Sequence, residues 1–368
     1  MKMKREQKYY VPELNEIERK TKNFFILVLI FLLFDSNIIY ADSEYQEGKS
    51  ESMLNINYLG LIINAKFDVS LESRNFNFNP LEGKYSLVNY HHFLFISRRT
   101  TEDNFFFSAE VIERVFYEFG VRFPRFSVKF GRVLVPFGAD PLFHHNYGGL
   151  TGFDQKFVPF IWSELGGVFN SHILRTEKIL LSNDFYVVNG PSGDPEKIMT
   201  ISAGSPSNFA VGDRIKLGYS LLTAYASTYW VRYAPHYDLF MWGADFVGAY
   251  GFIPFFKNLS LKLGFAYMNV VGNRQTVGNY YHYANYLRID YKLPFNLFFR
   301  FIVGAKTFQN YSYPFYDTKT KDENDEFAFN FALMYRRGIF LSQIQYVKKL
   351  EGKEIKDDFM RILFSVEF

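Results

Sequence analysis

The sequence predicts an all-β fold: an antiparallel transmembrane β-barrel of about 16 strands, with 14 strands as the alternative count. Apolar and polar residues alternate over segments of about ten residues, the length that a tilted strand needs to cross a bilayer. The 368 residues include 44 Phe, 27 Tyr and 3 Trp, which suits a lipid-facing surface with aromatic girdles. Mean hydropathy is −0.11, and the only continuous apolar run lies near the N-terminus, so a bundle of membrane helices is excluded.

The N-terminal region predicts an export signal. Basic residues precede an apolar run from Phe24 to Phe34, and the small residue Ala41 stands before Asp42. A basic region, a short apolar core and a small residue at the cleavage site are the three parts of a secretory signal. An uncleaved inner-membrane anchor is the alternative, although the run is short for a spanning helix. We predict a signal peptide over 1–41, a polar segment over 42–55 and one barrel domain over 56–368.

Strand segments then follow along the chain with a period of two. This alternation places large apolar residues on one face and most charged residues on the other. A soluble β-sandwich also alternates, but its strands are nearer five or six residues long and its apolar face packs on a second sheet. The clearest alternating segments are Phe105–Ile112, Leu259–Met268, Phe295–Lys306, Phe327–Arg336 and Met360–Phe368.

Connection lengths set the expected number of strands, because outer-membrane barrels alternate short periplasmic turns with longer outer loops. Breaks between Lys197 and Tyr233 are not located by the pattern, which keeps 14 strands open. The expected short connections are Arg99–Asp103, Phe123–Arg125, Thr176–Lys178, Ile253–Phe256, Leu293–Phe295 and Arg336–Gly338. The expected long connections are Asn75–Lys84, Pro136–Leu165, Gly190–Ser207, Val271–Asn279, Asn310–Asp325 and Glu351–Lys356.

The last strand ends on Phe368. An alternating C-terminal strand with a terminal Phe resembles the assembly signal of bacterial outer-membrane β-barrels. The resemblance implies an outer-membrane location, with the lipid bilayer, lipopolysaccharide and the barrel-assembly machinery as partners. The alternative is an ordinary C-terminal strand in a soluble sheet.

Two short motifs flank the longest connection. Lys129 to Gly138 reads KFGRVLVPFG, and Trp162 to Gly166 reads WSELG. Together they resemble the phosphate-selective porin O and P group, in which this connection folds into the barrel and narrows the pore. A mobile outer loop that never enters the lumen is the alternative. Phosphate selectivity does not follow, because the phosphate-binding residues of that group have no counterpart identified here. The resemblance implies these constriction-loop candidates: Asp140, His144, His145, Asp154, Lys156 and Glu164.

Strand parity also predicts which charged residues face the lumen. The basic ones exceed the acidic ones modestly, which predicts a weak anion preference. The alternative is a wall of paired charges with little selectivity. The pore-lining candidates are Lys129, Lys262, Arg288, Arg300, Lys306, Arg336 and Arg361.

We therefore predict a porin that lets small hydrophilic solutes or ions diffuse passively, as a single barrel or a homotrimer. The alternatives are a non-conducting barrel that acts as a surface scaffold or adhesin, and a channel for hydrophobic substrates. The seven His residues form no recognised catalytic motif, so an enzyme is not expected. The sequence has no Cys, so no thiolate metal site is expected, and no cofactor is implied. The net charge of +3 is too small to predict nucleic-acid binding.

Overall fold

The computed structural model describes residues 54–56, 61–74, 85–88, 92–98, 104–112, 116–139, 163–189, 209–234, 237–272, 280–309, 326–351 and 359–367. The predicted signal peptide over 1–41 and the terminal Phe368 lie outside these ranges and stay predictions. No helix in these ranges is long and apolar enough to cross a membrane.

Antiparallel strands make up nearly all of the described structure. A single 3-10 turn, η3 (Pro254–Phe256), lies between two of them. The strands are β1 (Leu54–Ile56), β2 (Leu61–Arg74), β3 (Tyr85–Val88), β4 (His92–Arg98), β5 (Phe105–Glu110), β6 (Tyr117–Arg122), β7 (Phe126–Leu134), β8 (Ser163–Arg175), β9 (Ile179–Asn189), β10 (Phe209–Tyr219), β11 (Leu222–Ala234), β12 (Tyr237–Gly248), β13 (Leu259–Gly272), β14 (Tyr280–Leu293), β15 (Leu297–Gln309), β16 (Glu326–Arg337), β17 (Phe340–Glu351) and β18 (Phe359–Glu367).

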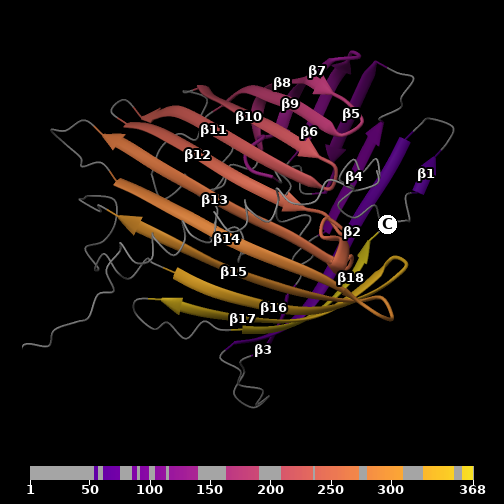
Figure 1. Ribbon diagram of the computed structural model, residues 1–368. Helices are drawn as coiled ribbons and strands as arrows, with labels where there is room; N and C mark the ends of the chain where they lie inside the picture. The colour runs from indigo at the N-terminus through magenta and orange to yellow at the C-terminus, as the bar shows by residue number, and fades with distance from the viewer. Residues whose placement is uncertain are drawn as a thin grey trace, which may run out of the picture. The chain divides into compact units, whose positions relative to one another are not determined.

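The strands close into a barrel of 16 positions (Figure 1). From β4 to β18 each strand pairs with the next, and β18 pairs back with β2 to close the ring. β3 and β4 both pair with β2, at its two ends, and so share one position. β1 pairs with the start of β2, and β18 pairs with the rest of β2. β1 and β18 therefore share one position in the ring. The predicted 16 strands are confirmed.

Residue exposure alternates along the strands as the barrel requires. In β16, Phe327, Phe331 and Leu333 are exposed on the outer face, whereas Ala328 and Asn330 are buried on the inner face. The same alternation runs through β13, β15 and β18. Exposed large apolar residues therefore form the outer surface, which is the surface that lipid requires.

Short and long connections alternate from β6 to β11 and again from β13 to β18, but not between β11 and β13, where β11–β12 is a short connection and β12–β13 spans 249–258. Most predicted connections fall where the strand ends require them, including the long ones after β7, β9 and β15. The sequence did not reveal the break between β11 and β12 at 235–236 or the tight turn between β10 and β11, where Ser220 has φ 53°. Both fall in or beside the region whose alternation was weak.

Candidate functional site: the inner wall and the segment docked on it

The chain leaving β7 docks against the inner faces of β10, β11 and β12. The backbone N–H of Gly138 donates to Ser227 Oγ at 3.0 Å. Arg214 Nη1 donates to the carbonyl oxygen of Gly138 at 3.1 Å. The backbone N–H of Ala139 donates to the carboxylate of Asp245. These three contacts hold residues 135–139, which we call the docked segment, on strands that are three to five positions away from β7 in the ring.

The local sequence explains why the chain leaves the sheet at this point. Pro136 has no N–H to donate to a neighbouring strand, so the β7 ladder stops before it. Gly138 has φ +77°, a conformation that other residues adopt only with strain. Gly243 on β12 lies under Phe137, and a Cβ there would sit 3.2 Å from Phe137 Cζ. The absence of a side chain at Gly243 therefore makes room for the ring of Phe137.

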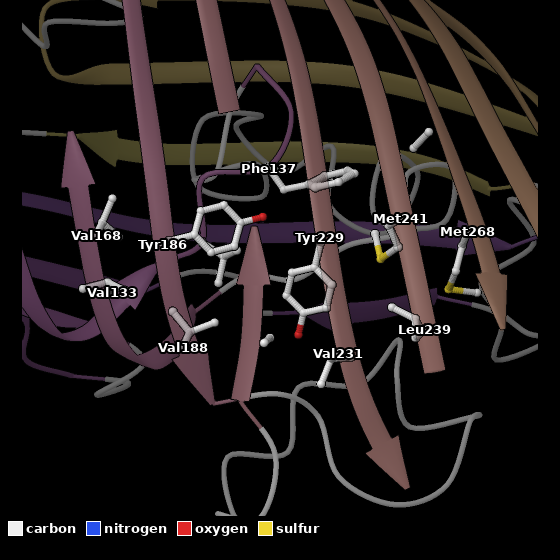
Figure 2. Close-up of a cluster of buried hydrophobic side chains, with 13 residues drawn as sticks. Val133, Phe137, Val168, Tyr186, Val188, Tyr229, Val231, Leu239, Met241 and Met268 are labelled. Atoms are coloured by element: carbon white, nitrogen blue, oxygen red, sulfur yellow. The ribbon is translucent and has the colours of Figure 1, made fainter. Parts of the chain in front are cut away.

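An apolar cluster packs around the docked segment. Tyr186 crosses Gly212 and donates from its hydroxyl to the backbone carbonyl of Thr228 at 2.7 Å. Strand parity placed large apolar residues on the face opposite the charged ones, so this apolar cluster on the inner wall was not predicted. It lies on β7 to β13, partly in the region where strand breaks could not be placed. Figure 2 shows the larger side chains of the cluster across neighbouring strands. The members are Val133, Val135, Phe137, Val168, Tyr186, Val188, Ala210, Tyr229, Val231, Leu239, Met241, Ala266 and Met268.

Arg214 is itself held in place by a polar network beside this cluster. Its Nε and Nη2 donate to Asp184 Oδ2 at 2.9 and 2.7 Å. Asn170 Nδ2 donates to the other carboxylate oxygen of Asp184 at 2.7 Å. The guanidinium thus has one nitrogen left for the carbonyl of Gly138, in an orientation fixed by the carboxylate. No sequence motif marks this arrangement, which depends on the register between β9 and β10.

Most of the pore-lining candidates with described side chains lie in ion pairs. Asp290 bridges Arg288 and Arg300, each at 2.6 Å, and all three are buried. Lys262 is buried on the inner face of β13. The side chain of Lys306 lies outside the described set. The remaining pairs are Lys129–Glu118 at 2.7 Å, Arg361–Glu72 at 2.5 Å, Lys66–Glu367 at 3.0 Å and Arg336–Glu367.

An aromatic ring from the β12–β13 connection covers one end of this charged wall. Lys292 Nζ lies 3.9 Å from the ring centroid of Tyr250, close enough for a cation–π contact. Burial, with the nearby charge of Asp290, raises the pKa of Tyr250 to about 12. The phenol therefore stays neutral at every physiological pH and presents its ring, and not a negative charge, to Lys292.

The constriction-loop candidates divide between described and undescribed residues. Asp140, His144, His145, Asp154 and Lys156 lie outside the described residues. Glu164 lies near the start of β8, buried on the inner face and directly opposite Val133 of β7. The docked segment places the start of this connection inside the ring, and the pore-narrowing role of the candidate residues stays a prediction.

Comparisons with known proteins place the fold. No protein-family model matches the chain, and no curated protein matches it either. An anion-selective porin from Comamonas acidovorans has a similar structure, with a TM-score of 0.56 at 8% identity over 84% of this chain and 99% of that one. OmpF of Salmonella typhi in complex with daunomycin has a TM-score of 0.55 at 11% identity, over 85% and 99%. Outer-membrane expressed OmpT of Vibrio cholerae has a TM-score of 0.54 at 8% identity, over 86% and 100%.

The fold is that of the porins. A closed barrel satisfies all of its backbone hydrogen bonds between strands, and its exposed outer band is apolar, so this porin-like barrel has the surface of a membrane-spanning protein. The prediction that the chain is not an enzyme does not stand. Barrels that share this fold include OmpT proteins as well as porins, so the fold decides neither for nor against catalysis.

Proposed function

We propose that this barrel is an outer-membrane porin through which small hydrophilic solutes and ions diffuse passively, with a weak anion preference. The observation that carries the proposal is the closed ring of 16 strands with an apolar outer face and a charged inner face. A ring of this size encloses an aqueous channel when side chains alone line it. Charges on the wall then set which ions pass.

The anion preference rests on the balance of charges on the described inner faces. Basic side chains slightly outnumber acidic ones there, and most of them are paired, so the preference is weak. The basic side chains are Lys66, Arg122, Lys129, Arg214, Lys216, Lys262, Arg288, Lys292, Arg300, Arg336 and Arg361. The acidic side chains are Asp68, Glu72, Glu110, Glu118, Glu164, Asp184, Asp245, Asp290 and Glu367.

We further propose that the whole β7–β8 connection narrows the channel, as the resemblance to the porin O and P group implies. The hydrogen bonds of Gly138 support this, because they direct the start of the connection toward β10 to β12. We also propose that the chain is a member of that group, on the basis of the two sequence motifs. We further propose that the barrel forms a homotrimer, because the similar barrel OmpT of Vibrio cholerae has a trimer form. Lipopolysaccharide and the barrel-assembly machinery are the expected partners in the membrane.

Single-channel recording in a planar lipid bilayer tests the proposal. We expect stable ohmic current steps and a reversal potential, under a KCl gradient, that shows a mild preference for chloride. Cation preference would contradict the charge argument and leave the porin intact. Absence of current from a folded, heat-modifiable barrel would contradict the porin and favour a closed scaffold or adhesin.

The docked segment has a test of its own in the same recordings. Ser227→Ala removes the acceptor for the N–H of Gly138, which leaves that group unpaired and weakens docking by about 1 kcal/mol. We expect larger fluctuations of the open-channel current than in the wild type. Thr223→Val is the control, since it removes a hydroxyl from the inner face of the same strand at a position away from Gly138. Equal fluctuations in the two variants would show that docking does not affect the channel.

A channel for hydrophobic substrates is the second candidate, and the inner-wall apolar cluster is the observation that favours it. Tyr229, Met241 and Met268 would line such a path. Uptake of an apolar dye into proteoliposomes, reduced by Met241→Gln and Met268→Gln, would support this candidate. Ion conductance without dye uptake would support the hydrophilic porin.

A further inference from the structure

Four polar but uncharged side chains form a group on the inner faces of β16, β17 and β18. We call Asn330, Gln343, Gln345 and Ser365 the amide patch. All four are at most 2% exposed. Gln345 lies opposite Ala332 in the register, and Asn330 lies one inward position further along β16, so the two side chains are diagonal neighbours. Its central strand, β17, lies six ring positions from β11, where the docked segment is bound.

The hydrogen-bonding capacity of the amide patch is largely unused. Gln343 Nε2 donates to Gln345 Oε1 at 3.1 Å. Among the described groups, Gln343 Oε1, Gln345 Nε2, Ser365 Oγ and both amide atoms of Asn330 have no hydrogen-bond partner. The patch therefore presents acceptors and donors side by side, both aimed inward. A buried polar group without a partner is costly, so these atoms favour any molecule that can pair with them.

The surrounding residues make the patch distinct from the rest of the wall. Two charged side chains lie directly opposite members of the patch. Arg361, opposite Gln345, is buried in its pair with Glu72, and Asp68, opposite Ser365, is also buried. Small side chains, Ala328 and Ala332, flank Asn330 on the same inner face. The positive charge of Arg361 is thus balanced by Glu72, while the amide groups of the patch keep unused donors and acceptors.

We propose that the amide patch is a binding site for uncharged polyhydroxy solutes, of the sugar or polyol class, on their way through the channel. This inference rests on the proposed porin function. A hydroxyl group both donates and accepts, so a polyol can pair with amide nitrogens and oxygens at once. An anion can use only the donors, and its charge finds no unpaired partner at Arg361. The solute class therefore follows from the chemistry of the wall at this place.

Sucrose-induced block of the single-channel current in KCl tests the inference, with inorganic phosphate as the charged comparison. We expect sucrose to reduce the current saturably, while phosphate at equal concentration does not. Asn330→Leu and Gln345→Leu remove amides with little change in volume, and each should raise the half-blocking concentration of sucrose about fivefold, the effect of one lost hydrogen bond. Thr223→Val, on the inner face of β11, is the control, and its half-blocking concentration of sucrose should equal that of the wild type.

The outcomes separate the inference from the function on which it rests. Normal KCl conductance without saturable sucrose block overturns the amide patch as a binding site and keeps the porin. Block by phosphate, or block that is equal in the leucine variants and the wild type, overturns it as well. Loss of all conductance in the wild-type protein contradicts the porin itself. Unchanged unitary KCl conductance and heat-modifiable migration of the leucine variants confirm that they fold.

Discussion

At the residue scale, glycine and aromatic residues are paired across neighbouring strands. Tyr186 lies opposite Gly212, and Tyr286 lies opposite Gly264. In each pair a Cβ added to the glycine would collide with the aromatic ring. The glycine thus provides the space in which the ring lies flat on the inner wall. In both pairs the hydroxyl reaches the strand beyond, at Thr228 or Asp245.

Gly212→Ala tests this arrangement. The new Cβ would collide with the ring of Tyr186 and break its hydrogen bond to the carbonyl of Thr228. We expect a loss of about 1–3 kcal/mol in the free energy of unfolding. Equilibrium unfolding in urea with the barrel reconstituted in lipid vesicles measures it.

Gly218→Ala is the matched control. It lies on the same strand and the same face, and its nearest neighbour is Leu180 Cβ at an ordinary 3.5 Å. We expect it to unfold like the wild type or slightly later, because alanine has the lower conformational entropy in the unfolded chain. Equal destabilisation by the two substitutions would show that the space above Gly212 is not the cause.

At the scale of single elements, each strand has one face for lipid and one for the lumen. In β17, Ile344 is 49% exposed on the outer face, while its neighbours Gln343 and Gln345 are each 1% exposed on the inner face. A substitution therefore acts according to its face and its depth. Charged residues on the outer face of β17 should be costly near the middle of the strand and tolerated near its ends.

Ile344→Arg should therefore lower the free energy of unfolding by about 2–4 kcal/mol. Leu350→Arg, on the same face near the end of β17, should cost about 0–1 kcal/mol. The vesicle unfolding assay compares the two variants directly. If both cost the same, the outer face of β17 does not lie against lipid.

The sequence predicted elements better than it predicted the site. Dyad alternation was strong in β13, β15, β16 and β18, because the polar residues in the central part of each of these strands lie on one face. In β10 and β11 it was weak: Asp213 and Thr228 interrupt the outer face, and Tyr225 and Tyr229 occupy the inner one. The docking of Gly138 on Ser227 and Arg214 could not be predicted, because these residues are 89 and 76 positions apart in the chain. The alternation of apolar and polar residues along a strand carries no information about contacts between residues so far apart.

At the scale of the whole molecule, one strand pair closes the ring. β18 meets β2 over the register from Phe359 opposite Arg74 to Glu367 opposite Lys66. Ion pairs cross this seam, among them Arg361 with Glu72 and Lys66 with Glu367. Arg361 and Glu72 are both buried, so each depends on the other to balance its charge.

Glu72→Gln should therefore destabilise the barrel by about 3–5 kcal/mol, because it removes the carboxylate charge that faces the buried guanidinium of Arg361. The double variant Glu72→Gln with Arg361→Met removes both charges and should recover most of this loss. A double-mutant cycle on unfolding free energies measures the coupling. Simple addition of the two single effects would show that the pair contributes nothing to closure.

The seam between β18 and β2 also fixes an order of events during assembly. Most other neighbouring strands are joined by short stretches of chain, whereas Arg361 and Glu72 are separated by 289 positions. Contacts between residues so distant in sequence form late, since ordering the intervening chain costs entropy first. Until then the edges of β2 and β18 both present unpaired backbone groups, on which a foreign strand can dock. The edges of β2 and β18 therefore both need protection from foreign strands until the two strands meet.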